Sequence, residues 1–315
     1  MRYFIAGGAG FIGSHLARAL IADGAEILVY DNFSSGKEHN LKTIKDHISI
    51  IHGDVKDLGL LSASMKEDDI VYHFASNPDI SKAAAQPDID FWEGTYLTNN
   101  ILEAMRRCGA KKLLYASGSG VYGEAGSAPV KETGSDMRPV STYGASKLAC
   151  ESMICAYSYM FGIDAAAFRF ANVVGPNQTH GVGYDFVNKL LKNSEELYIL
   201  GDGRQDKPYI YVDDVISAVR MVEAGRLSGF DVYNVAVSET VSVNAIADIA
   251  EEILGLSNVK RLYSGGDRGW KGDVPVIRLD FSKIRALGWN SRYGAKEALY
   301  MSISAMYNEA MRASE

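Results

Sequence analysis

The chain has 315 residues, of which 47% are hydrophobic and 23% are charged, and this composition is ordinary for a globular enzyme with a sizeable core. The formal net charge of −7 argues against a surface for nucleic acid or for anionic membranes, so we expect neither as a partner. The three cysteines form no C-x-x-C pair, which favours idle thiols in a reducing compartment. Because no apolar run reaches membrane-spanning length and the first strand begins at once, we expect a cytoplasmic protein without a signal peptide.

The first element is a buried strand over residues 1–6, followed by a glycine turn and a helix over 11–20. The turn contains the overlapping patterns Gly8-x-Gly10-x-x-Gly13 and Gly7-x-x-Gly10-x-x-Gly13. Such glycines allow a tight turn, let backbone N–H groups approach a pyrophosphate, and let the helix pack closely on the sheet. The turn predicts a dinucleotide site.

A second strand over residues 26–31 ends in Asp31, about 20 residues after the glycine turn. A carboxylate at this place accepts hydrogen bonds from the adenosine ribose and repels a 2′-phosphate. We therefore expect NAD, rather than NADP, as the cofactor.

Strand-like and helix-like segments continue to alternate through the first half of the chain. The further expected strands are 48–51, 69–74, 112–116 and 165–169, and the long expected helices are 88–108 and 143–161. This alternation predicts an α/β fold with a Rossmann-type, doubly wound parallel sheet. Ligands of such sheets bind at the carboxyl ends of the strands.

Tyr143 and Lys147 lie one turn apart on the same face of the expected helix 143–161. An ammonium near a phenol favours the phenolate, so we expect Lys147 to lower the pKa of Tyr143 towards the working range of a base. His73 is interpreted as a packed core residue, and His180 has no acidic or cysteine partner at metal-ligand spacing, so no metal site is predicted.

The alternation breaks after Gly175-Pro176, where loops and short elements become frequent. We predict an NAD-binding Rossmann domain over residues 1–175, rejoined by about 208–235. Residues 176–207 and 236–315 are expected to form a smaller C-terminal α/β lobe that binds the substrate.

Taken together, these segments resemble the extended short-chain dehydrogenases/reductases. Within them the chain is most similar to the NAD-dependent nucleotide-sugar epimerases and dehydratases, and nearest to the UDP-galactose (UDP-glucose) 4-epimerases. The segments that carry the resemblance are 7–13, 31–32, 53–55, 73–75, 121–123, 143–147, 169–176, 201–203 and 209–214.

The resemblance implies that Tyr143 takes the proton of a sugar hydroxyl while NAD takes the hydride, and that Lys147 holds the nicotinamide ribose. The implied cofactor site consists of Gly7, Gly10, Phe11, Ile12, Gly13, Asp31, Asn32, Ser35, Gly36, Asp54, Val55, Phe74, Ala75, Ser76, Tyr143, Lys147 and Phe170. The implied contacts of the sugar diphosphate are Asn172, Lys207 and either Arg268 or Lys271.

Two positions depart from the family pattern. The Ser or Thr that bonds the reacting hydroxyl falls on Gly118, so Ser117 or Ser119 would have to supply that hydroxyl, or the group is missing. Gly94 stands where relatives often carry an Asn beside the cofactor.

The loop before Val121-Tyr122-Gly123 also separates related activities. The 4,6-dehydratases resemble this family but need Asp-Glu there, and UDP-glucuronate decarboxylases typically place a Glu, whereas this chain has Ser119-Gly120. Transfer of a hydride out and back needs no further acid, so we expect a nucleotide-sugar 4-epimerase acting on a UDP-hexose. The alternatives are a nucleotide-4-keto-sugar reductase and a non-catalytic NAD-binding relative.

The resemblance further implies a homodimer in which the helices 88–108 and 143–161 pair across a two-fold axis. The apolar residues expected on these helices are Phe91, Leu97, Ile101, Met153, Ile154 and Tyr157. The alternative is that one chain covers these faces itself.

Overall fold

A computed structural model describes residues 1–134 and 136–314. Its centre is a seven-stranded sheet with the order β11-β6-β5-β4-β1-β2-β3, in which every neighbouring pair is parallel. The strands are β1 (Arg2–Ala6), β2 (Glu26–Asp31), β3 (Ser49–His52), β4 (Asp69–His73), β5 (Lys112–Gly118), β6 (Asp164–Phe170) and β11 (Phe230–Val235). The strand order reverses at β1, so its carboxyl end lies at the switch point where such sheets bind ligands.

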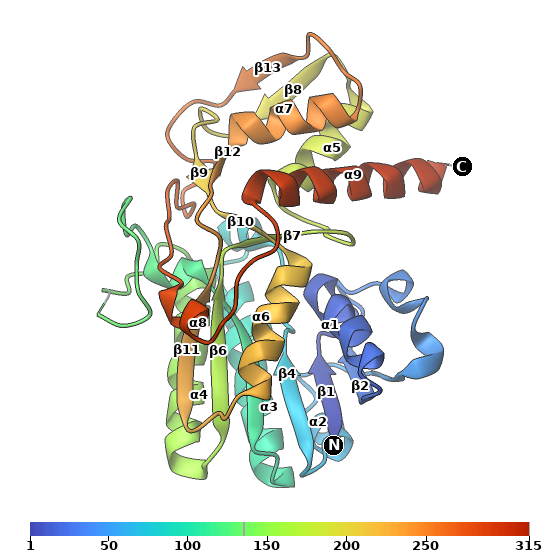
Figure 1. Ribbon diagram of the computed structural model, residues 1–315, viewed down its shortest axis with the longest axis vertical. Helices are drawn as coiled ribbons and strands as arrows, with labels where there is room; N and C mark the ends of the chain where they lie inside the picture. The colour runs from blue at the N-terminus through green and yellow to red at the C-terminus, as the bar shows by residue number, and fades with distance from the viewer. Residues whose placement is uncertain (135, 315) are drawn as a thin grey trace.

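Helices cover both faces of this sheet, as Figure 1 shows. One core cluster joins a face of the sheet to α1 (Phe11–Ala22) and α6 (Val212–Ala224). A second cluster joins the opposite face to α2 (Leu58–Ser64), α3 (Tyr96–Cys108) and α4 (Thr142–Phe161). Both sides of the central strands are therefore buried, which is why β1 and β4 are buried at every residue. The predicted α/β, doubly wound sheet is confirmed.

The chain builds a second group of elements after β6, most of which lie in the upper part of Figure 1, whereas α8 (Ser282–Ala286) lies beside β11. Its two-stranded sheets pair β7 (Asn172–Val174) with β10 (Tyr209–Tyr211), β8 (Glu196–Ile199) with β13 (Lys260–Tyr263), and β9 (Asp206–Lys207) with β12 (Val241–Ser242). The helices after β6, besides α6, are α5 (Val182–Lys192), α7 (Val243–Ile253), α8 (Ser282–Ala286) and α9 (Ala295–Ser314). Between these elements, α6 and β11 return to the central sheet and extend it beyond β6.

The expected continuous helix over residues 88–108 is only partly correct. A π-helical segment, Phe91–Thr95, precedes α3, which begins at Tyr96. Gly94 sits inside this segment, and a Cβ at that position would lie 2.4 Å from Ser146 Oγ on α4. The wider turn thus brings bare backbone against α4, and single π turns of this kind are frequent at functional sites.

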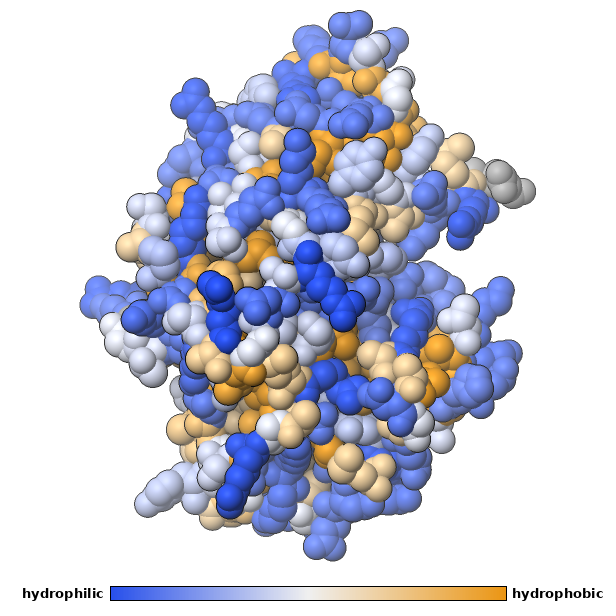
Figure 2. Space-filling model, in the orientation of Figure 1, coloured by the Kyte–Doolittle hydropathy of each residue, from blue (hydrophilic) through white to orange (hydrophobic). Residues whose placement is uncertain are grey.

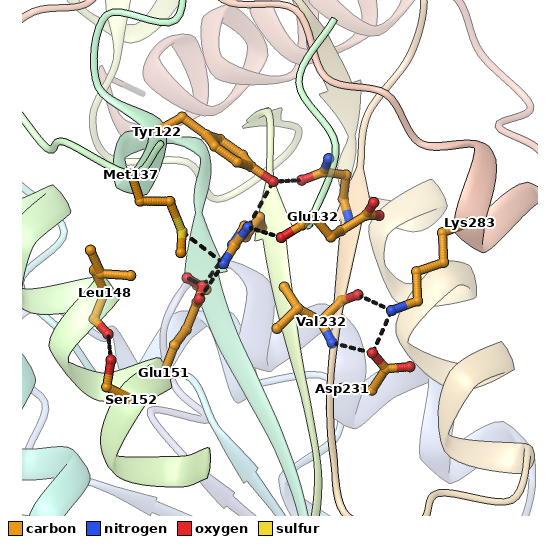
Figure 3. Close-up of polar contacts among 12 residues, drawn as sticks. Tyr122, Glu132, Met137, Leu148, Glu151, Ser152, Asp231, Val232 and Lys283 are labelled. Carbon is orange, nitrogen blue, oxygen red and sulfur yellow. Dashed lines mark hydrogen bonds and ion pairs between the residues drawn. The ribbon is translucent and has the colours of Figure 1, made fainter. Parts of the chain in front are cut away.

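A buried charge network crosses the sheet beneath its carboxyl edge (Figure 3). Arg169 on β6 donates to both carboxylate oxygens of Glu151 on α4, at 3.0 and 2.6 Å, and both residues are almost fully buried. The guanidinium also donates to Tyr122 Oη at 2.8 Å, and that hydroxyl donates to Asn234 Oδ1 on β11 at 2.8 Å. Bidentate Arg–carboxylate pairs impose a strict geometry, so this network fixes α4 relative to β6 and β11.

Some of the apolar residues expected on the dimer helices 88–108 and 143–161 are buried within the chain and do not reach its surface. On the face in Figure 2, hydrophobic residues are scattered among hydrophilic ones. Leu97, Ile101 and Ile154 are buried within the chain, so the expectation that they would face a partner is wrong; they complete the core between α3, α4 and the sheet. Within the described ranges, no helix is both long and apolar enough to cross a membrane.

Candidate active site

A cavity of about 1090 Å³ runs along the carboxyl ends of the central strands. It continues between the sheet and the elements that follow β6, where residues of α5 and of the segment 269–277 form its far wall. Nearly all of the cofactor and catalytic residues expected from the sequence line it. The exception is Gly36, which lies against Asp31, since a Cβ there would be 2.9 Å from Asp31 Oδ1.

The glycine turn after β1 is packed too closely for side chains. Gly7 has a φ of +80°, and a Cβ on it would lie 2.6 Å from the backbone nitrogen of Ala75. A Cβ on Gly13 would lie 2.3 Å from the carbonyl oxygen of Gly7. α1 begins directly after this turn, and its N-cap, Gly10, offers no side-chain hydrogen bond to the first-turn N–H groups. These groups face the cavity and suit the pyrophosphate of a dinucleotide.

Asp31 ends β2 at the edge of the cavity and is 7% exposed. Its Oδ2 accepts from the N–H of Ala9 and its Oδ1 from the N–H of Phe33, both at 2.8 Å. Burial raises the pKa of this carboxyl, and the two backbone hydrogen bonds oppose that shift. Each carboxylate oxygen retains a lone pair, so the side chain can still accept a hydroxyl group.

The neighbouring residues Asn32 and Asp54 lie next to Asp31 in the cavity wall and bond to each other, Nδ2 to Oδ2, at 3.0 Å. Together these polar groups and the glycine turn fit an adenosine diphosphate.

Tyr143 and Lys147 lie on the first turns of α4, and both line the cavity. Ser141 caps the helix by accepting from the N–H of Gly144 at 3.1 Å. The Lys147 ammonium is buried, donates to the carbonyl oxygen of Ala116 at 2.8 Å, and lies 5.5 Å from the centre of the Tyr143 ring. The predicted pair on one helix face is therefore present.

The expected effect of Lys147 on Tyr143 is wrong for the protein without cofactor. The pKa of Tyr143 is raised, first by burial and then by the charge of Asp90. Burial also lowers the pKa of Lys147 to about 8, so its own charge is costly. Desolvation opposes the charged form of both groups, and the Lys147 ammonium above the Tyr143 ring does not reverse the shift of the phenol.

The serine loop after β5 places its two hydroxyls differently. Ser117 is buried and donates to Glu151 Oε1 at 2.5 Å, so its hydroxyl belongs to the Arg169 network. Ser119 lines the cavity, and among the described residues its side chain has no hydrogen-bond partner. A Cβ at Gly118 would lie 3.8 Å from Tyr143 Oη, an ordinary van der Waals contact. Position 118 therefore faces the phenol and has room for a side chain.

Two of the three residues expected at a sugar diphosphate are in the cavity wall. Asn172 donates to the carbonyl oxygen of Pro208 at 3.1 Å, and Lys207 forms an ion pair with Asp273. Arg268 does not line the cavity; its guanidinium binds Glu124 at 2.7 Å and Asp267 at 3.1 Å. Lys271 is also outside the wall, although its neighbours Trp270 and Gly272 are within it.

The segment 178–192 also lines the cavity, and none of its residues was identified from the sequence as part of the site. This segment contains α5, whose apolar side packs into the core while Tyr184, Asn188 and Lys192 face the cavity. Its sequence carries no motif, so only the helical spacing of its apolar residues was available as a signal. His73 is 1% exposed and contacts Thr98 Oγ1 at 2.9 Å, which confirms the core interpretation; burial lowers its pKa to about 3. The described residues contain no cluster of potential metal ligands.

Comparison with known proteins agrees with this geometry. Residues 3–236 match the NAD dependent epimerase/dehydratase family. The chain belongs to this family. Its cofactor is NAD, which the glycine turn and the polar edge at Asp31 fit.

Relatives of this family member include enzymes of more than one activity. A putative UDP-glucose 4-epimerase from Methanocaldococcus jannaschii is 32% identical over 310 residues, 96% of this chain and 98% of that protein. A crystal structure of a UDP-galactose 4-epimerase has a TM-score of 0.88 at 36% identity, covering 98% of this chain and 99% of the other. The dTDP-glucose 4,6-dehydratase DesIV from Streptomyces venezuelae, solved with NAD, has a TM-score of 0.91 at 27% identity, covering 99% and 98%.

The arrangement at Asp31 predicts a preference for NAD over NADP. Hydrogen bonds to a charged group contribute about 1.5–3 kcal/mol, which corresponds to a ratio of about ten to a hundred in affinity. Calorimetric titration of the protein with each dinucleotide measures this ratio. Asp31→Ser removes the charge and should bring the affinities for NAD and NADP closer together. Asp46→Ser changes an exposed acid outside the cavity wall and should leave their ratio unchanged. Equal affinities of the unchanged protein for NAD and NADP would contradict the assignment.

Proposed function

We propose that this family member is a nucleotide-sugar 4-epimerase whose substrate is a UDP-hexose. The observation that carries the proposal is the Tyr143–Lys147 pair in the wall of the NAD cavity, beside a loop with no acid at positions 119 and 120. A dehydratase must also protonate a leaving hydroxyl, which requires an additional acid, whereas an epimerase moves one proton and one hydride out and back. The UDP-sugar 4-epimerases among the similar proteins support the same activity.

In this proposal Tyr143 is the base. Its Oη takes the proton of the C4 hydroxyl and returns it after the sugar ring has presented its other face. Bound NAD supplies the acceptor and then the donor of the C4 hydride, and its cationic ring favours the phenolate. The Lys147 ammonium, held by the carbonyl of Ala116, stabilises the same phenolate and reaches the ribose. No oxidant is consumed, because the 4-keto sugar is reduced before it leaves.

The substrate would lie across the cavity from the cofactor edge. Asn172 and Lys207 are placed to meet the diphosphate, with Lys207 released from Asp273 when the anion arrives. The elements after β6 form this side of the cavity, which supports the proposed division into an NAD-binding domain and a substrate lobe.

The activity is tested by incubating purified protein with UDP-glucose and separating UDP-glucose from UDP-galactose by chromatography. We expect interconversion without release of NADH, and a kcat reduced by roughly 10²–10⁴ in Tyr143→Phe, the range typical of a lost general base. Tyr300→Phe, at a tyrosine on α9 that is 44% exposed and outside the cavity wall, is the matched control. In the same assay Lys207→Met should raise the KM for UDP-glucose, because the diphosphate would lose a cationic partner. Consumption of NADH with a 4-keto sugar would instead indicate a reductase, and unchanged turnover in Tyr143→Phe would exclude the mechanism.

We propose that Ser119 supplies the hydroxyl that Gly118 lacks, since Ser117 is engaged with Glu151. Ser119→Ala should then slow turnover by about tenfold or more, in keeping with the loss of one hydrogen bond in the transition state. Gly118→Ser, which has room beside Tyr143 Oη, should restore the rate in the Ser119→Ala background. Full activity of Ser119→Ala would show that Tyr143 works with water or substrate alone.

We also propose a homodimer formed by α3, α4 and the π-helical segment before α3. The exposed aromatic residues Phe91, Trp92 and Tyr159 and the neighbouring Met160 lie on these elements, with exposed fractions from 45 to 93%. Phe91 and Trp92 lie beside the first turns of α4, because Asp90 bonds Thr142 and Ser146 there, whereas Tyr159 and Met160 lie on its last turn. A partner that covers α4 along its length would bury both pairs of exposed apolar side chains. Light scattering at micromolar concentration should report twice the 34.3 kDa of one chain, and Trp92→Glu should shift the protein to monomer. A monomer in the unchanged protein would contradict the proposal.

A further inference from the structure

Asp90 is a buried acid beside the catalytic helix that the sequence did not single out. It directly precedes the π-helical segment Phe91–Thr95 and is 2% exposed. Its Oδ2 accepts from Thr142 Oγ1 at 2.7 Å, and its Oδ1 accepts from Asn77 Nδ2 at 3.0 Å. Its backbone carbonyl accepts from Ser146 Oγ at 2.7 Å. A buried carboxylate is costly unless its oxygens are bonded, and here both of them are.

These three contacts join the two sides of the reaction end of the cavity. Asn77 lies in the loop after β4 that lines the cavity, while Thr142 and Ser146 immediately precede Tyr143 and Lys147 on α4. The bond between Thr95 Oγ1 and Ser146 Oγ, at 2.9 Å, belongs to the same contact surface. A side chain at Gly94 would displace Ser146, which gives a physical reason for glycine at that position. Asp90 is thus the group through which the cavity loop and the first two turns of α4 are held together.

The charge of Asp90 acts on the same two residues. It opposes ionisation of the Tyr143 phenol and favours the ammonium of Lys147, in each case after the larger effect of burial on the pKa. The other groups that face this pair are Cys150 and Glu151 on α4, Tyr115 on β5 and His73 on β4. Of these, Glu151 is paired with Arg169, and burial lowers the pKa of His73 to about 3. Asp90 forms no ion pair among the described residues, and its carboxylate is held by the neutral side chains of Thr142 and Asn77.

We propose that Asp90 is a positioning residue that fixes the first turns of α4 against the cavity loop and places a negative charge beside Tyr143 and Lys147. This inference rests on the proposed role of Tyr143 as base. A fixed carboxylate beside the phenol opposes loss of the phenolic proton, and for the same reason Asp90 makes the phenolate of Tyr143 a stronger base once the cofactor is bound. It also keeps Lys147 charged despite burial.

The decisive variant is Asp90→Asn, which keeps the shape and removes the charge. The Asn oxygen can accept from Asn77, and its NH₂ group can donate to the Thr142 hydroxyl, which also acts as an acceptor. We expect the titration of Tyr143 to move to lower pH, because an opposing charge is gone, and the rise of kcat with pH to move in the same direction. Tyrosinate absorbance of the NAD-bound protein, measured as the difference between each protein and its Tyr143→Phe counterpart, follows this titration without substrate. NAD is present in every sample because burial alone keeps the phenol neutral.

Two further variants separate the charge from the hydrogen bonds. Thr142→Val removes the hydroxyl that bonds Asp90 and keeps the Asp90 carboxylate. We expect kcat to fall by about three- to tenfold, which is less than the roughly hundredfold cost of a 1 Å misplacement. The titration of Tyr143 should not move to lower pH in this variant. Asp88→Asn changes an exposed acid two residues away and should alter neither property.

An unchanged Tyr143 titration in folded Asp90→Asn would overturn the proposal. Thermal unfolding shows whether that variant folds, and if it does not, Thr142→Val decides alone, since an unchanged kcat would also overturn it. Because the absorbance titration needs no turnover, its outcome is independent of the proposed activity. Normal turnover of Tyr143→Phe would exclude Tyr143 as the base and leave the charge measurement valid.

Discussion

The candidate site depends on how α4 is held against the carboxyl ends of β5 and β6. Two successive turns of this helix make buried polar contacts: Ser146 bonds the carbonyl of Asp90 and Lys147 that of Ala116 on one turn, and Glu151 bonds Arg169 on the next. Because the helix is buried against the sheet, none of these groups can turn to water without leaving an unpaired polar atom inside. The helix is consequently fixed in rotation and in height, and the position of Tyr143 follows from contacts made beneath it.

The same burial decides the electrostatics of the pair. Burial raises the pKa of the Tyr143 phenol and lowers that of the Lys147 ammonium to about 8. In the protein alone, burial therefore favours the neutral form of each group, although their one-turn spacing by itself would favour a phenolate beside an ammonium. In the proposed mechanism, the positive charge of the cofactor would favour the phenolate. Proton transfer would then depend on cofactor binding, so that Tyr143 would not deprotonate a sugar before a hydride acceptor is in place.

Lys207 in the cavity wall and Arg268 outside it are each paired with acids. Lys207 binds Asp273, whose carboxylate also accepts from the N–H of Gly269 at 3.1 Å, and Arg268 binds Glu124 outside the cavity wall. A diphosphate would compete with these carboxylates, so part of its binding energy would go into releasing Lys207. A Cβ at Gly118 would lie 3.8 Å from Tyr143 Oη, so the loop leaves room for a side chain beside the phenol.

The sequence by itself determined the Rossmann-type sheet, the glycine turn, Asp31 and the Tyr143–Lys147 pair, because each of these depends on spacing within one strand, turn or helix. The π-helical segment before α3, the engagement of Ser117 with Glu151, and the position of Arg268 outside the cavity depended on residues far apart in the chain. The direction of the Tyr143 pKa shift was decided by burial and by Asp90, 53 positions earlier in the sequence. Desolvation and long-range charge are properties of the packed molecule, and only the tertiary structure decided them.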